Sequence, residues 1–247
     1  ALSVVFITIL GVVLYGSITL VPVMLQNLAG YDAFTAGLVL GVGGIGGFIS
    51  MFLTARLITK IDGKYLIMLG VVLHFISMIT MSSLNLEASF FQFCIPRFIQ
   101  GLSLGFLFIP ISVASVAYLP KEKIGSATGI YNLMRNIGGS IGIAVVMTLL
   151  NRRAQYHQTM IVDNLHQINN SLNYNIHKLS SFLSSKITNI PGYEKFLSYN
   201  LLGLEVQKQA YLKSFLDNFY LFSFLTLIIG FAFLLKKTPK GKEISLH

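Results

Sequence analysis

The chain has 247 residues, of which 54% are hydrophobic and only 11% are charged, and its mean hydropathy is +0.71. Soluble domains carry about 25% charged residues, so this composition argues against a soluble domain and favours a chain that crosses a membrane several times. A single cysteine excludes an internal disulfide framework and counts against a cysteine-rich metal site.

Six apolar segments are each long enough to cross a bilayer, which takes about 20 mostly apolar residues. Backbone groups inside lipid must form hydrogen bonds within their own segment, so each span is predicted to be a helix. The spans cover residues 2–25, 36–58, 65–84, 90–117, 125–150 and 215–235.

Basic residues gather in every second connection between the spans. The connections at residues 26–35 and 85–89 contain no lysine or arginine. Positively charged loops stay on the cytoplasmic side of a membrane, which predicts that both ends of this sequence are cytoplasmic. The net charge of +9 is thereby explained without a nucleic-acid partner. The basic residues are Arg56, Lys60, Lys64, Lys121, Lys123, Lys236, Lys237, Lys240 and Lys242.

The connection at residues 151–214 is long and polar, and this topology places it outside the membrane. Apolar residues recur along it at steps of three and four, which predicts an amphipathic helix that ends at Pro191-Gly192. A second helical stretch at residues 194–213 leads into the last span. The insert is interpreted as a docking surface for an external partner, or as a helical hairpin packed on itself or on the bilayer. The apolar positions are Ile161, Leu165, Ile168, Leu172, Ile176, Leu179, Leu183 and Ile187.

The predicted fold is therefore an all-α membrane protein with six transmembrane helices and an external helical insert. Five spans occupy residues 1–150, and the insert occupies residues 151–214. The last span covers residues 215–235, and a basic cytoplasmic tail covers residues 236–247.

Arg135 lies in the fifth span, where a charge costs about 2.5–3.5 kcal/mol on insertion scales. Helical spacing places it on one polar stripe, which is predicted to face inward because a lipid-facing stripe would be too costly. The stripe either binds an anionic or polar substrate, neutralises a carboxylate of a neighbouring helix, or forms hydrogen bonds between helices. Its members are Thr128, Asn132, Arg135, Asn136, Gly139 and Ser140.

Arg97 and Gln100 lie three residues apart in the fourth span, near its outer end. They indicate either a buried gating or ion-coupling pair, or an arginine that extends to the outer interface. Small residues at a spacing of four let helices approach closely. Such pairs are Gly101 with Gly105 and Gly138 with Gly142.

No aspartate or glutamate lies in the middle of any span, and His74 is the one histidine inside a span. Its interpretation as a packed polar residue is favoured over one as a proton relay. If transport is driven by protons, the coupling carboxylate is expected in a part of the protein outside this sequence. Nucleophile triads and metal-ligand clusters are absent from the sequence, so an enzyme is not expected.

Several sequence runs resemble those of a known transporter family. Residues 96–101 (PRFIQG), followed by Gly105, resemble the RxxQG signature of the major facilitator superfamily. Residues 132–142 (NLMRNIGGSIG) are similar to a late helix of its fourteen-span drug:proton antiporters, of the EmrB/QacA type. Residues 21–26 (VPVMLQ) resemble the opening of the C-terminal half in that branch.

The resemblance implies that these six spans are the ninth to fourteenth of a longer transporter. The N-terminal half of that transporter would then be missing from this sequence. The resemblance also implies a protein of the bacterial inner (plasma) membrane that exports hydrophobic, often cationic compounds. Export would be driven by a proton gradient without a cofactor, and members of the EmrB type have a periplasmic adaptor as partner. Arg135, Asn132 and Asn136 are expected to line the substrate cavity, with Tyr15 and Gln26 as weaker candidates, and Arg97 and Gln100 to couple or gate transport. The alternatives are a transporter of a fatty acid, siderophore or metabolite, and a membrane anchor for an envelope complex.

Overall fold

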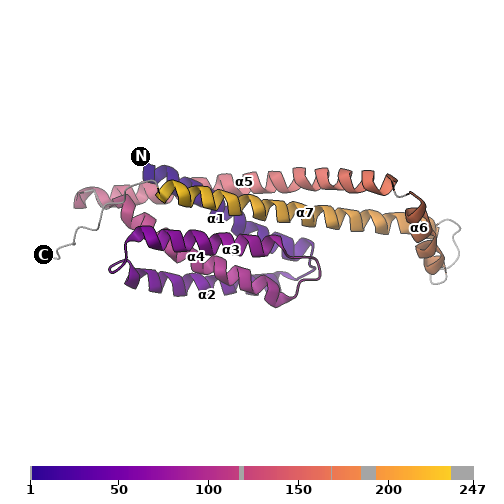
Figure 1. The fold of residues 1–247 in the computed structure, drawn as a ribbon, viewed down its shortest axis with the longest axis horizontal. Coiled ribbons are helices and arrows are strands. Elements are labelled where there is room, and N and C mark those ends of the chain that lie inside the picture. Colours follow the sequence, from indigo (N-terminus) through magenta and orange to yellow (C-terminus); the bar gives the residue numbers. More distant parts are fainter. Residues whose placement is uncertain (1, 117–119, 168, 185–192, 235–247) are drawn as a thin grey trace. The chain divides into compact units, whose positions relative to one another are not determined.

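The structure is a computed structural model that describes residues 2–116, 120–167, 169–184 and 193–234 (Figure 1). The described residues form helices joined by short turns, which confirms the predicted all-α fold. The predicted basic tail at residues 236–247 and the predicted helix break at Pro191-Gly192 lie outside the described residues. The helices are α1 (Leu2–Asn27), α2 (Ala33–Leu57), α3 (Gly63–Ser82), α4 (Phe90–Val116), α5 (Lys121–Gln167), α6 (Asn169–Ser184) and α7 (Tyr193–Leu234).

The chain divides into two compact units. One comprises Ala1–Thr148 with Leu216–His247, and the other comprises Leu149–Phe215. Five helices of the described residues, α1 to α5, are long and apolar enough to cross a membrane. The sixth predicted span lies in α7, apart from its last residue, which lies outside the described residues.

The helices α5 and α7 extend well beyond the predicted spans at residues 125–150 and 215–235. α5 continues past the expected end at residue 150 to Gln167, because no glycine or proline interrupts the sequence after Gly142. The amphipathic helix predicted from residue 161 to 187 is divided between α5, which ends at Gln167, and α6, which begins at Asn169.

In the first unit, α4 packs against α2 and α3, and glycines set how closely the backbones approach. A Cβ atom added at Gly101 would lie 1.9 Å from the Gly43 carbonyl oxygen of α2. The contact between α1 and α5 is similarly close: a Cβ at Gly138 would lie 2.1 Å from the Thr8 carbonyl oxygen, and one at Gly142 would lie 2.3 Å from that of Val12. These positions exclude every larger residue unless the helices separate.

The turn between α1 and α2 is defined by a glycine and a helix cap. Gly30 adopts φ = 71°, a left-handed conformation that side chains disfavour. Asp32 then caps α2, because its carboxylate accepts hydrogen bonds from the Phe34 N–H at 3.2 Å and from the Thr35 hydroxyl. The hydrogen bond from Thr35 holds the pKa of Asp32 below its ordinary value.

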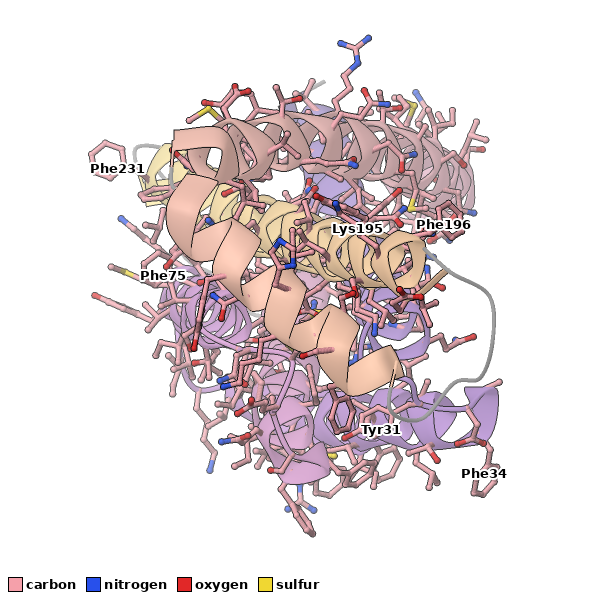
Figure 2. The ribbon with its side chains drawn as sticks, turned by 90° about the vertical axis from the view of Figure 1, so that its right-hand side faces the viewer. Tyr31, Phe34, Phe75, Lys195, Phe196 and Phe231 are labelled. Atoms are coloured by element: carbon pink, nitrogen blue, oxygen red, sulfur yellow. The ribbon has the colours of Figure 1, made fainter. Side chains whose placement is uncertain are left out.

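Large apolar side chains cover the outside of the first unit. Phe34 is 74% exposed, Phe48 is 77% exposed and Phe231 is 65% exposed. Figure 2 shows the rings of Phe34 and Phe231 projecting away from the helices that carry them. Exposed apolar surface on this scale indicates contact with lipid or with other protein.

The second unit has a small core of its own. Leu150 and Ala154 of α5 are buried, as are Ala210 and Phe215 of α7. The Ser214 hydroxyl donates to the Leu150 carbonyl at 2.6 Å, which ties the two helices together within this unit.

Candidate functional site

A buried arginine forms the centre of a polar network in the first unit. Arg97 of α4 is only 6% exposed, and its Nη1 donates to the side-chain oxygen of Gln100. Gln100 Nε2 in turn donates to Ser17 Oγ of α1 at 2.9 Å, and the Ser17 hydroxyl donates to the Leu14 carbonyl at 3.0 Å. Because arginine is only a donor, this order of contacts fixes which end of the Gln100 amide faces Arg97. The network therefore joins α4 to α1 through one oriented amide.

His74 of α3 joins the same network from the other side. The Ser103 hydroxyl donates to the backbone carbonyl of Gln100 at 2.6 Å. Its oxygen therefore accepts from His74 Nδ1 at 3.2 Å. This pattern assigns the proton to Nδ1, and His74 Nε2 is a buried acceptor without a hydrogen-bond partner. His74 thus acts as a hydrogen-bond donor inside the bundle, in agreement with its interpretation as a packed polar residue.

Arg97 has a second contact, with the backbone of α2. A Cβ atom at Gly43 would lie 2.8 Å from Arg97 Nε, so only glycine leaves room for the guanidinium here. Arg97 Nε has no hydrogen-bond partner, and no carboxylate pairs with Arg97 among the residues that the structure describes. The charge of Arg97 therefore lies inside an apolar bundle with neutral hydrogen-bond partners and no counter-ion among the described residues.

Arg135 of α5 has a different environment. Its side chain is partly buried, and its guanidinium lies over the Phe108 ring of α4, 5.5 Å from the ring centre. Such cation–π contacts are worth about 0.5–1 kcal/mol at exposed sites and more when water is excluded. Arg135 Nε is buried without a hydrogen-bond partner, so this charge also has donor capacity to spare.

The polar stripe predicted on α5 is divided between two surroundings. Gly139 packs against α1, where a Cβ would lie 2.7 Å from the Tyr15 ring. Asn132, Asn136 and Ser140 are exposed in this unit, as are Leu133 and Ile137 on the flanks of the helix. The expected inward orientation of these amides therefore stays a prediction.

The structure brings only some of the predicted site residues together. Tyr15 is partly buried beside Gly139, close along α5 to Arg135. Gln26 is exposed one residue before the end of α1, eleven residues after Tyr15. The sequence did not predict Ser17 and Ser103 as members of the network, because a serine in an apolar helix has no sequence feature that reveals a partner on another helix.

An apolar cavity borders His74, with a volume of about 10 Å³. It is water-sized, whereas pockets for drug-sized ligands occupy about 300–1,000 Å³. Among the described residues, no group of three histidine, cysteine or acidic side chains lies close enough to hold a metal ion. The cavity is lined by Leu10, Val13, Leu14, Val71, His74, Leu107 and Thr226.

Comparisons with known proteins agree with this arrangement of membrane helices. The family model of the Major Facilitator Superfamily matches residues 1–153. The chain is 28% identical over 225 residues to the probable multidrug resistance protein EmrY of Escherichia coli K12, an alignment that covers 88% of this chain and 42% of that protein.

Two further relatives are similar over a shorter region. The colistin resistance protein EmrB of Acinetobacter baumannii is 31% identical over 160 residues, which is 65% of this chain and 31% of that protein. The fatty acid resistance protein FarB of Neisseria gonorrhoeae is 27% identical over 159 residues, which is 64% of this chain and 31% of that protein. The chain thus spans less than half the length of these relatives.

Proposed function

Because the chain belongs to the Major Facilitator Superfamily, we propose that it is the C-terminal half of a secondary transporter that exports drugs from a bacterial cell, driven by proton entry. The observation that carries this proposal is the pair of guanidiniums, Arg97 and Arg135, held among apolar helices without a carboxylate partner in the described residues. Charges inside membrane helices mark substrate or ion pathways. The multidrug resistance names of several relatives support the drug class. No step of this function needs enzymatic chemistry or a cofactor.

The remaining half is proposed to pack on two open glycine faces. A Cβ atom added at Gly37, Gly41 or Gly44 of α2 would meet no atom of another helix within 4 Å, and the same holds for Gly125 and Gly129 of α5. Glycines at such spacing let membrane helices approach closely, as they do on the opposite face of α2. The length of the relatives supports the presence of further helices.

The substrate is proposed to bind between the two halves, near the middle of the membrane. Asn132 and Asn136 are exposed on α5, and Arg135 lies between them in sequence with unused donor capacity. Tyr15 adds an aromatic surface beside the same helix. Arg97 and Gln100 would couple proton movement to the change of access, because their hydrogen bonds join α4 to α1.

The second unit is proposed to lie on the periplasmic side and to bind an adaptor protein. Several aromatic rings are exposed on it, including Tyr174 at 69% and Phe196 at 64%. Figure 2 shows Phe196 next to Lys195 near the start of α7. Aromatic residues are enriched in protein interfaces, which supports a docking role for this unit.

Ethidium efflux tests the proposed function directly. Cells that express the full-length transporter are expected to expel ethidium when energised, and a protonophore should abolish the efflux. Arg135→Ala is expected to lower the initial rate at least about tenfold, as loss of a charge-assisted contact predicts, with equal protein in the membrane. Arg56→Ala, at the exposed end of α2, is the matched control because it also removes an arginine, and it should leave the rate unchanged. Absence of efflux, with the protein shown in the membrane, would contradict a drug exporter.

Export of fatty acids is a second candidate, because the guanidinium of Arg135 suits a carboxylate and one relative is a fatty acid resistance protein. Growth in the presence of long-chain fatty acids separates this substrate from ethidium. A purely anchoring protein would instead lose all function when residues 151–214 are deleted, whereas a transporter is expected to keep substrate binding.

A further inference from the structure

We propose that α4 bends at the step from Gly101 to Gly105, and that the Ser50 hydroxyl of α2 holds the backbone groups of this step when it opens. The inference rests on the proposed transport function for its purpose, since a helix that bends is useful only in a protein that changes shape. Its geometry stands on contacts within the first unit alone.

The Ser50 hydroxyl contacts both the donor and the acceptor of one backbone hydrogen bond of α4. In a regular helix, the N–H of residue 105 donates to the carbonyl of residue 101. Here the Gly105 N–H is 3.1 Å from Ser50 Oγ, and Ser50 Oγ is 3.4 Å from the Gly101 carbonyl oxygen. A hydroxyl accepts and donates at once, so Ser50 is placed to replace the direct bond between these two groups.

The Ser50 proton has a choice of two acceptors. Ser50 Oγ lies 2.9 Å from the Gly47 carbonyl oxygen of its own helix and 3.4 Å from the Gly101 carbonyl oxygen of α4. With α4 as observed, the shorter contact to Gly47 is favoured. When the step from Gly101 to Gly105 opens, the proton can pass to Gly101, and neither backbone group is left without a partner. Side chains that insert into a helix in this way are a known cause of kinks.

Other features make this step the weakest part of α4. Glycine at both positions lowers helix propensity by about 1 kcal/mol each relative to alanine. Pro96 and Pro110 flank the step, and neither has an N–H to donate to the preceding turn. The Ser77 hydroxyl of α3 donates to the Pro96 carbonyl at 2.6 Å, which ties the outer side of the step to α3.

A second hydroxyl of α2 is available for the bent form. Thr54 is fully buried, and its Oγ1 has no hydrogen-bond partner. It lies one turn after Ser50 on the same face of α2, so the contact between Ser50 and Gly105 predicts that Thr54 lies beside the next turn of α4. In that turn, Pro110 cannot donate to the carbonyl of Phe106. Thr54 is therefore placed to donate to this carbonyl when the inner half of α4 moves.

The step from Gly101 to Gly105, called the hinge below, lies between the contacts of Arg97 and the contact of Arg135. Arg97 and Gln100 lie on the outer side of the step, where Gln100 donates to Ser17 of α1. Phe108, which contacts Arg135 of α5, lies on the inner side. Bending at the hinge would thus move Phe108 and change its contact with Arg135, while the Arg97 network stays in place.

Distances between spin labels test the hinge in the full-length, cysteine-free transporter. Labels at Phe48 of α2 and Val113 of inner α4 should give two distance populations, whose ratio changes between pH 6 and pH 8 or on addition of ethidium. Phe48 paired with Phe91 of outer α4 is the control and should give one unchanged distance. All three side chains are exposed, so the labels fit without repacking the core.

Ser50→Ala should leave one population and slow ethidium efflux about fivefold, the effect of one lost hydrogen bond. Ser82→Ala is the matched control, because Ser82 is buried but bonds only the Ile79 carbonyl of its own helix. A single Phe48–Val113 distance under every condition would overturn the hinge, even in a chain that exports ethidium. Two populations in a chain that exports nothing would keep the hinge and reject the drug-export function. If Ser50→Ala does not fold, the distances in the unsubstituted chain decide alone.

Discussion

Gly101→Ala is expected to destabilise the first unit by about 3 kcal/mol, at the upper end of the range for overpacked cores. The added Cβ would lie 1.9 Å from the Gly43 carbonyl oxygen, and the nearest atoms belong to backbone that cannot rotate away. The helices α2 and α4 must separate, which also disturbs the contact between Gly43 and Arg97. For a unit of this size, the thermal midpoint should fall by about 6–12 °C. Thermal unfolding of the purified full-length transporter in detergent measures the change.

Gly203→Ala is the matched control for this substitution. Gly203 also lies inside a helix, but nothing lies within 4 Å of the position that its Cβ would take. Alanine should be neutral there or stabilise the helix by up to about 1 kcal/mol. Equal midpoints for the two variants would contradict the close contact between α2 and α4.

The helices themselves could be predicted from the sequence, because a membrane permits little besides helices in long apolar segments. Their lengths were harder to predict. α5 extends to Gln167, since nothing in its polar continuation stops a helix even though its hydropathy changes. Hydropathy indicates where a helix can lie in lipid, whereas glycine, proline and capping residues indicate where it ends.

The environment of individual glycines could not be predicted. Gly37 and Gly43 lie on one helix in similar apolar sequence, yet Gly43 contacts Arg97 and Gly37 has no neighbour. Which face of α2 meets α4 is decided by packing between distant segments, and both faces carry small residues. The same limit applies to Ser17, whose partner Gln100 lies 83 residues away in the chain.

Arg97→Lys is expected to lower proton-driven efflux by about 10- to 100-fold, the effect of losing one hydrogen bond to a charged group in a buried site. Arginine presents its donors in a rigid fork, so Nη1 reaches Gln100 while Nε lies against Gly43. Lysine keeps the charge but has a single compact ammonium, which cannot make both contacts. Ethidium efflux from energised cells, compared with efflux down a gradient in de-energised cells, measures coupling separately from passage. A coupling role predicts loss in energised cells with downhill efflux retained.

Arg56→Lys provides the control for the same chemical change. Arg56 is exposed at the end of α2, where its guanidinium lies 4.2 Å from the Phe52 ring centre, and both efflux rates should stay unchanged. Arg97→Met then separates charge from volume, because methionine fills much of the space of arginine without its charge. If Arg97 only packs against Gly43, methionine should restore energised efflux to at least half of the original rate. If the charge is needed, methionine should transport no better than lysine, and wild-type efflux from both variants would reject any role for Arg97 in transport.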